Sequence, residues 1–121
     1  NLYDVLFRHV AFYMMEVDLT AMTYKHTLIS TLGVIGSATP SGWDADTDMT
    51  YNEEDGSWNL TTNLTDGEIK IRANNDWDIN WGGSIAEPTF NAGNIAVTAG
   101  NYTIRFIPQC DGMNLLTLTK N

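Results

Sequence analysis

Hydrophobic and polar residues alternate along much of this chain, which is the pattern of β-strands with one buried face. Residues 13–19 and 22–26 form the first two such segments, and the connection between them is short enough for a hairpin. Residues 32–35 make a compact, mostly apolar strand that ends at a glycine. Residues 2–10 depart from the alternation, and we expect one or two turns of helix there.

Four later segments show the alternation more clearly, over residues 57–64, 68–74, 102–106 and 116–119. In the second of them Ile69, Ile71 and Ala73 share the side that is predicted to face inward. Turn-forming clusters of Gly, Asp and Asn separate the strands, at residues 52–56, 65–67, 99–101 and 110–112.

Short strands bounded by turn residues, with no helix of convincing length, predict an all-β fold that is a sandwich or a small barrel. The 121 residues are enough for one domain with its own core. We therefore assign residues 11–121 to a single antiparallel β-sandwich domain. Residues 1–10 do not fit its pattern and are interpreted as the remnant of a preceding segment or an excursion of the chain.

Charge and cysteine content narrow the possible partners. Acidic residues outnumber basic ones 15 to 6, which gives a formal net charge of −9 at pH 7. Such a field repels nucleic-acid backbones and anionic membranes but does not penalise a neutral ligand. Cys110 is the only cysteine, so an intrachain disulfide and a cysteine-based metal cluster are both excluded, and we expect a packed or semi-exposed thiol. No apolar run approaches the roughly 20 residues that span a bilayer.

The four tryptophans are the most informative residues of the sequence. Trp58 is in phase with the apolar face of a strand, which predicts a place in the core. Trp43 lies in a polar loop over residues 37–48, and Trp77 and Trp81 lie in a segment rich in Asn, Asp and Gly. Large apolar rings that stay exposed tend to mark binding sites. The alternative is that these rings close the ends of the sandwich, and it is weakest for Trp43.

An exposed indole suits a sugar because a pyranose ring has an apolar face of C–H groups and a polar rim of hydroxyls. Lys70, Arg72 and Asn74 point to one side of a predicted strand that runs directly into the loop of Trp77. This order could set a row of donors beside an aromatic platform. The residues alone slightly favour an ordinary solvated strand face, where charge pairs contribute little to stability.

Metal binding and catalysis have weaker support. Residues 44–48 resemble the start of a calcium loop, but the Gly and Glu that an EF-hand needs later in the loop are absent, which favours a plain acidic turn. Asp76 and Asp78 are close in sequence, yet that spacing does not set the opposed geometry of a glycosidase. We therefore predict no catalytic residue, no metal and no cofactor.

Several motifs in combination resemble the domains of SusE/SusF-type outer-membrane starch-binding proteins. The similarity extends over most of residues 32–120 and lies in residues 34–44, 48–51, 67–74, 76–83, 93–95 and 100–103.

This resemblance implies an immunoglobulin-like β-sandwich that binds a polysaccharide or oligosaccharide without catalysis. It implies that Trp43 is the first aromatic platform and Trp77 the next, and that Lys70, Arg72 and Asn74 donate hydrogen bonds to sugar hydroxyls. It also implies a full-length protein held at the bacterial outer-membrane surface by a lipid anchor, beside neighbouring domains and outer-membrane glycan-transport components. Starch-like α-glucan is the expected ligand.

The alternative function is a structural spacer domain of a surface lipoprotein with no ligand of its own. A spacer predicts that Trp43, Trp77 and Trp81 are all buried. A binding module predicts exposed indoles, so the solvent exposure and mutual orientation of these rings separate the two hypotheses.

Overall fold

The computed structural model describes the backbone of residues 2–8, 11–18, 23–108 and 114–121, and the side chains of those residues from 29 onward. These residues form thirteen strands, and none of them belongs to a helix that could cross a membrane. The strands are β1 (Leu2–Arg8), β2 (Ala11–Asp18), β3 (Thr23–Ile29), β4 (Leu32–Ile35), β5 (Thr47–Asp48), β6 (Thr50–Asn52), β7 (Ser57–Leu64), β8 (Gly67–Ala73), β9 (Asn80–Gly83), β10 (Pro88–Phe90), β11 (Ile95–Val97), β12 (Gly100–Ile107) and β13 (Leu115–Lys120).

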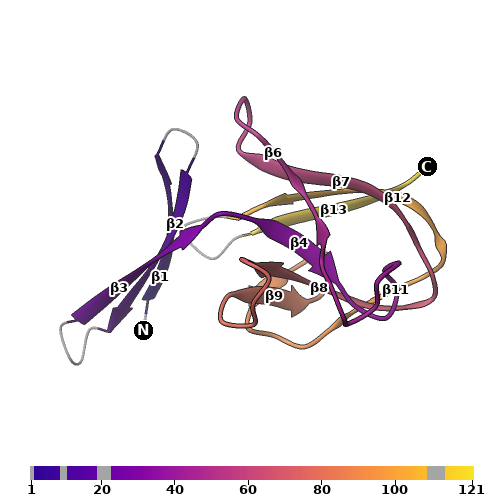
Figure 1. The fold of residues 1–121 in the computed structure, drawn as a ribbon, viewed down its shortest axis with the longest axis horizontal. Coiled ribbons are helices and arrows are strands. Elements are labelled where there is room, and N and C mark those ends of the chain that lie inside the picture. The colour runs from indigo at the N-terminus through magenta and orange to yellow at the C-terminus, as the bar shows by residue number, and fades with distance from the viewer. Residues whose placement is uncertain (1, 9–10, 19–22, 109–113) are drawn as a thin grey trace.

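The first three strands form an antiparallel meander that stands to one side of the other sheets (Figure 1). The helical turns expected for residues 2–10 are wrong, because residues 2–8 pair with β2 along their whole length, from Leu2 opposite Val17 to Arg8 opposite Ala11. An isolated helix this short is marginal, whereas strand pairing satisfies its backbone groups over seven consecutive residues. β3 then leads directly into β4.

The larger sheet has six strands and is built around β8. β4 pairs with the C-terminal half of β8, and β9 pairs with that half as well, so β8 lies between them. β11 pairs with the N-terminal half, with Ile95 opposite Ile69. β5 extends the sheet beyond β4, and β10 extends it beyond β9. All of these pairs are antiparallel.

The smaller sheet has four strands in the order β13-β12-β7-β6, and it packs against the larger sheet (Figure 1). β12 pairs with β7 from Gly100 opposite Leu64 to Phe106 opposite Trp58. The all-β, antiparallel β-sandwich expected from the sequence is therefore confirmed.

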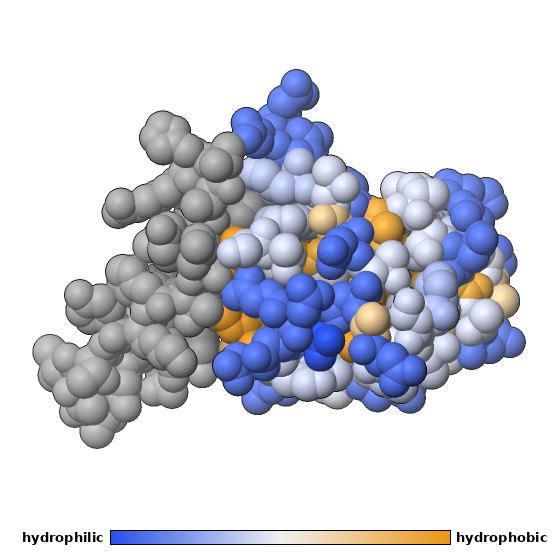
Figure 2. Space-filling model, in the orientation of Figure 1, coloured by the Kyte–Doolittle hydropathy of each residue, from blue (hydrophilic) through white to orange (hydrophobic). Residues whose placement is uncertain are grey.

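The core fills the space between the two sheets. Val34 and Ile71 of the larger sheet and Ile104 of the smaller sheet are completely buried. Trp81 of β9 reaches across to Phe106 of β12, with 5.1 Å between the ring centroids. The described residues on the face drawn in Figure 2 are mostly hydrophilic or neutral, with hydrophobic ones in small separate spots.

Two of the four tryptophans are core residues. Trp58 is 5% exposed, which confirms its prediction as a core residue. Trp81 is 1% exposed and also belongs to the core, so its ring is not available as a platform.

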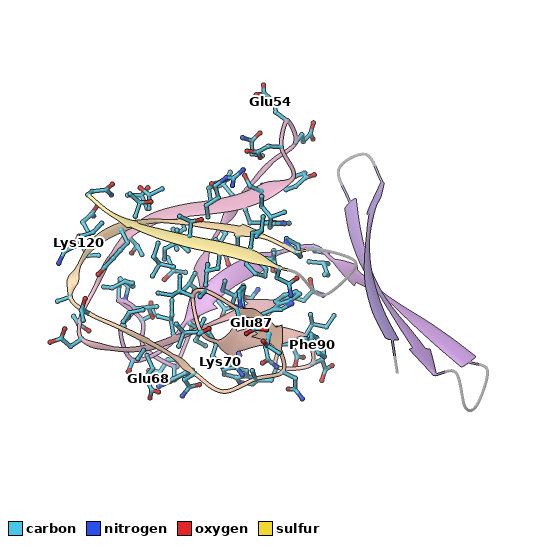
Figure 3. The ribbon with its side chains drawn as sticks, turned by 180° about the vertical axis from the view of Figure 1, so that it is seen from behind. Glu54, Glu68, Lys70, Glu87, Phe90 and Lys120 are labelled. Atoms are coloured by element: carbon cyan, nitrogen blue, oxygen red, sulfur yellow. The ribbon has the colours of Figure 1, made fainter. Side chains whose placement is uncertain are left out.

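The hairpin between β6 and β7 projects from the smaller sheet, with Glu54 at its tip (Figure 3). Asp55 stabilises the turn, because its carboxylate accepts hydrogen bonds from the backbone N–H and the hydroxyl of Ser57. The same carboxylate forms an ion pair with Arg105 of β12 at 2.9 Å. These contacts lower the pKa of Asp55 from 3.8 to about 2, with the Ser57 hydroxyl as the largest cause and Arg105 next.

Truncation of the Phe106 ring in the core should strongly destabilise the protein. Phe106 is completely buried, and we expect Phe106→Ala to lower the free energy of unfolding by about 3–5 kcal/mol in urea denaturation, because it leaves a cavity beside Trp81. Leu115→Thr is the control on the same sheet, since Leu115 is 53% exposed, and its effect should lie within about 0.5 kcal/mol. Equal losses for the two variants would contradict this account of the core.

Acid should weaken the hairpin through Asp55. The folded-state pKa lies below the ordinary value, so the contribution of this carboxylate to stability is present above pH 3.8 and lost as the pH falls towards about 2. The stability difference between wild type and Asp55→Asn should therefore be constant near neutral pH and shrink between pH 4 and pH 2 in denaturation series. Glu54→Gln makes the same charge change one residue away and serves as the control. A difference that stays constant down to pH 2 would show that Asp55 has no such role.

Candidate functional site

The outer side of β8 carries two cations that the fold buries. Its inner side holds Ile69, Ile71 and Ala73 in the core, as the alternation predicted. Its outer side holds Lys70 and Arg72, and each of them is only 9% exposed. Figure 3 shows Lys70 on the side of its sheet that faces away from the smaller sheet. The ordinary solvated face that the residues slightly favoured is therefore wrong for these two side chains.

The turn after β8 brings Trp77 back over this outer side. Asn74 and Asn75 have φ angles of 57° and 54°, and the N–H of Asp76 donates to the carbonyl of Ala73. Two successive positive φ angles are typical of a type I′ hairpin turn, which Asn tolerates better than most residues. The side chain of Asn80 then donates to the carbonyl of Trp77 at 2.8 Å, which ties the backbone of Trp77 to β9.

A second loop presents Trp43 from the other end of the sheet. After β4 the chain turns tightly, and the N–H of Gly36 donates to the carbonyl of Gly42. The hydroxyl of Thr39 donates inside this turn, to the carbonyl of Gly36 at 2.9 Å. Gly42 has a φ of 61°, a conformation that glycine adopts without strain, and Trp43 follows it. Hydrogen bonds within the loop therefore fix the backbone that presents the indole of Trp43.

The two loops bring Trp43 and Trp77 together on the surface. Their ring centroids are 6.0 Å apart and their planes are inclined by 37°. The residues are 41% and 45% exposed. Beneath Trp77 lie the guanidinium of Arg72, 4.8 Å from the ring centroid, and the Nζ of Lys70 at 5.6 Å. We call these four residues the indole platform.

The guanidinium of Arg72 is fixed by a buried carboxylate. Its Nε donates to Asp46 Oδ1 at 2.6 Å, and the Asp46 side chain is 1% exposed. A charge-assisted hydrogen bond of this length is among the stronger contacts in a protein. It leaves the terminal nitrogens of Arg72 for other partners.

Lys70 lies in a different electrostatic environment. Among the described residues, no carboxylate lies within ion-pair distance of its Nζ, since the ion pairs found there join Arg72 to Asp46 and Arg105 to Asp55. Burial lowers the pKa of the Lys70 ammonium below its ordinary value, because removal from water disfavours the charged form. The platform thus contains a partly desolvated cation that a ligand acceptor could satisfy.

Asn74 occupies a different position from the other predicted site residues. Its side-chain oxygen accepts hydrogen bonds from the backbone N–H groups of Ser30 at 2.8 Å and Thr31 at 3.4 Å. This contact joins the turn after β8 to the start of β4. The structure thus brings together Trp43, Trp77, Lys70 and Arg72, and it engages the oxygen of Asn74 in support of the turn.

Two residues of this site were not singled out from the sequence. Asp46 was noted only as part of the acidic run 44–48, and Asn80 only as part of the segment around Trp77. Asn80 lies opposite Arg72 in the register of β8 and β9. A prediction of β9 would have placed it beside Arg72, but a strand of four residues gives little alternation to detect.

The acidic run does not gather into a metal site. Within the part of the chain that the structure describes, no group of three His, Cys, Asp or Glu side chains is arranged to hold a metal ion. Asp44 and Asp48 are exposed, whereas Asp46 turns inward to Arg72. Cys110 lies outside the described residues.

Comparisons with protein-family models, with curated proteins and with solved structures found no match to this chain.

The desolvated ammonium of Lys70 should lower the stability of the folded protein, and replacing it with an apolar side chain should remove this effect. We expect Lys70→Met to leave the free energy of unfolding at pH 7 unchanged or higher, because Met keeps an apolar stem and removes a desolvated charge. The difference in free energy of unfolding between wild type and Lys70→Met should become smaller as the pH rises towards 10.5. Lys70 loses its proton at a lower pH in the folded protein than in the unfolded chain, so the unfavourable charge disappears from the folded state first.

Urea denaturation at pH 7, 9 and 10 measures both effects. Lys120→Met is the control, since Lys120 is exposed at the end of β13. A clear loss of stability in Lys70→Met at pH 7 would show that the ammonium itself stabilises the fold.

Proposed function

We propose that this chain is a non-catalytic carbohydrate-binding module that takes an α-glucan on its indole platform. The observation that supports this most directly is the pair of exposed indoles, 6.0 Å apart and inclined by 37°, with two buried cations against the ring of Trp77. An open aromatic surface with polar groups at its edge matches the apolar face and hydroxyl rim of a pyranose.

The exposure of the indoles supports binding over a spacer role. Large apolar side chains that stay on the surface lose the stabilisation of burial, about 25 cal/mol for each Å² of apolar area. Four large hydrophobic side chains among the described residues are exposed, namely Trp43, Trp77, Ile85 and Leu115, and two of them are these adjacent indoles. The spacer hypothesis expected both indoles to be buried, and only the third ring that it named, Trp81, is.

The cations beneath Trp77 give the site a defined polarity. Lys and Arg side chains donate hydrogen bonds and cannot accept them, so a ligand must offer acceptors such as hydroxyl oxygens. The Trp77 ring lies against Arg72, and because the residue is still 45% exposed, a sugar ring can reach the indole. We assign the stacking to Trp43 and Trp77, and the hydrogen bonds to Lys70 and to the terminal nitrogens of Arg72.

The inclination of the rings favours a curved ligand. Successive glucose rings of an α-1,4-linked chain turn relative to one another, whereas those of a β-1,4-linked chain form a flat ribbon. Two coplanar indoles would suit the ribbon, and two indoles inclined by 37° suit the turning chain. This agrees with the ligand that the SusE/SusF resemblance implies.

A lack of catalysis belongs to the same proposal. Asp46, the carboxylate in contact with Arg72 of the platform, is buried and paired with that guanidinium. A separate pocket of about 260 Å³ is lined by Ile85, Ala96, Val97, Thr98, Tyr102 and Leu118, and it contains no carboxylate. Glycoside hydrolysis needs two carboxyl groups on opposite sides of the bond, so we assign no catalytic role to the platform, where Asp46 is held in its pair with Arg72.

The resemblance also supplies the proposed setting of the module. We propose that the full-length protein is anchored by a lipid at the outer-membrane surface of a bacterium, near glycan-transport components. A single platform of this size binds modestly, and several linked modules on one protein would raise the overall affinity through effective concentration.

Affinity electrophoresis in native gels tests the proposal. Soluble α-glucan in the gel should retard the wild-type protein, and Trp43→Ala and Trp77→Ala should each weaken binding by about 30-fold, because truncating a central aromatic costs about 2 kcal/mol. Leu115→Ala removes an exposed apolar side chain from the smaller sheet and should bind as wild type.

A panel that includes β-1,4-glucan, mannan and xylan tests the ligand class in the same gels. Retardation by a flat β-glucan but not by α-glucan would reject the argument from ring inclination. A wild-type protein that no glycan retards would overturn the proposed function.

A further inference from the structure

One buried carboxylate connects the supports of both indoles. Asp46 follows Trp43 by three residues in the same loop, and its Oδ1 accepts the hydrogen bond of Arg72 Nε. Arg72 in turn lies against the ring of Trp77. A path of direct contacts therefore runs from the loop of Trp43 through Asp46 and Arg72 to the Trp77 ring.

The sheet provides a place for this carboxylate. Gly33 of β4 lies opposite Arg72 in the register, so it is on the same outer side of the sheet. A methyl group at Gly33 would lie only 2.8 Å from Asp46 Cβ and 3.1 Å from Asp46 Oδ2. Asp46 thus occupies the space that the missing side chain of Gly33 leaves beside Arg72.

Because Arg72 is buried, its charge requires a counter-ion, which Asp46 supplies. The guanidinium is withdrawn from water, and a buried cation without its counter-ion is strongly destabilised. Asp46 Oδ2 is itself buried and accepts no hydrogen bond from any residue that the structure describes. The contact between Asp46 and Arg72 therefore runs through Oδ1 alone, so the position of the guanidinium depends on that single oxygen.

We infer that Asp46 is a positioning residue that sets the mutual orientation of Trp43 and Trp77. It fixes the guanidinium that supports one ring and anchors the loop that presents the other. The backbone of Trp77 is held separately by Asn80, so Asp46 acts on the angle of the ring and not on the path of the turn. Its effect on ligand affinity rests on the proposed function, whereas its effect on ring geometry does not.

The ring geometry can be measured without a ligand. Two indoles with centroids 6.0 Å apart couple through their transition dipoles, and the resulting couplet in circular dichroism depends on the angle between the rings. Trp43→Phe and Trp77→Phe should each abolish the couplet and so identify it. We expect Asp46→Asn to reduce or invert the couplet at a temperature where the protein is fully folded.

The matched control for Asp46→Asn is Asp44→Asn. It makes the same change in charge two residues away, in an exposed side chain next to Trp43. This variant should keep the couplet. In α-glucan affinity gels, Asp46→Asn should bind about tenfold more weakly than Asp44→Asn, since residues in one contact network couple by roughly 0.5–3 kcal/mol.

Gly33→Ala tests the same contact from the other side without a change in charge. The added methyl group must displace Asp46, so the couplet should change as it does in Asp46→Asn. Gly93→Ala is its control, because a methyl group there meets no atom within 4 Å. If Asp46→Asn fails to fold, the couplet of Gly33→Ala decides the question.

The outcomes separate the two proposals. A couplet that is unchanged in both Asp46→Asn and Gly33→Ala overturns the positioning role, whatever the wild type binds. Failure of both variants to fold also overturns it, because Asp46 would then serve the whole domain. A couplet lost in Asp46→Asn, together with a wild type that no glycan retards, supports the positioning role and rejects the proposed function.

Discussion

The stack of Trp77 on Arg72, with Arg72 held by Asp46, is the interaction on which the described surface depends. The guanidinium that lies under the Trp77 ring is withdrawn from water, and the buried Asp46 carboxylate compensates its charge at 2.6 Å. The same carboxylate belongs to the loop of Trp43. One ion pair therefore joins two loops that would otherwise be independent, and the inclined pair of indoles is the result.

The stability of the β-sandwich core offsets the unfavourable burial of these charges. This core lies between the sheets, where Trp81 meets Phe106 and the apolar side of β8 is buried. Stability comes from that inner layer, so the outer side of β8 can hold two cations and an unsatisfied carboxylate oxygen at a cost. The turn at Asn74 and Asn75 then returns the chain across the same outer side. One side of β8 is thus apolar and packs in the core, whereas the other side carries the cations of the platform.

The sequence predicted the elements that are long enough to show a period. The alternation in β7, β8 and β12 was sufficient to assign their faces, and the inward position of Ile69 and Ile71 followed from it. β5, β6, β9, β10 and β11 have two to four residues each, and so short a strand cannot be told from a turn by periodicity. The first strand was mistaken for helical turns because its pairing with β2, and not its own pattern, decides its conformation.

By itself, the sequence determined the all-β class, the inward face of β8 and the small set of residues from which the platform is built. Only the tertiary structure decided which tryptophans are exposed, that Lys70 and Arg72 are buried, and that Asp46 is their neighbour. The physical reason is distance along the chain. Asp46 and Arg72 are 26 residues apart, and they meet because Gly33 of a third segment leaves space between them. Burial of a charge depends on such long-range contacts, and no local pattern records them.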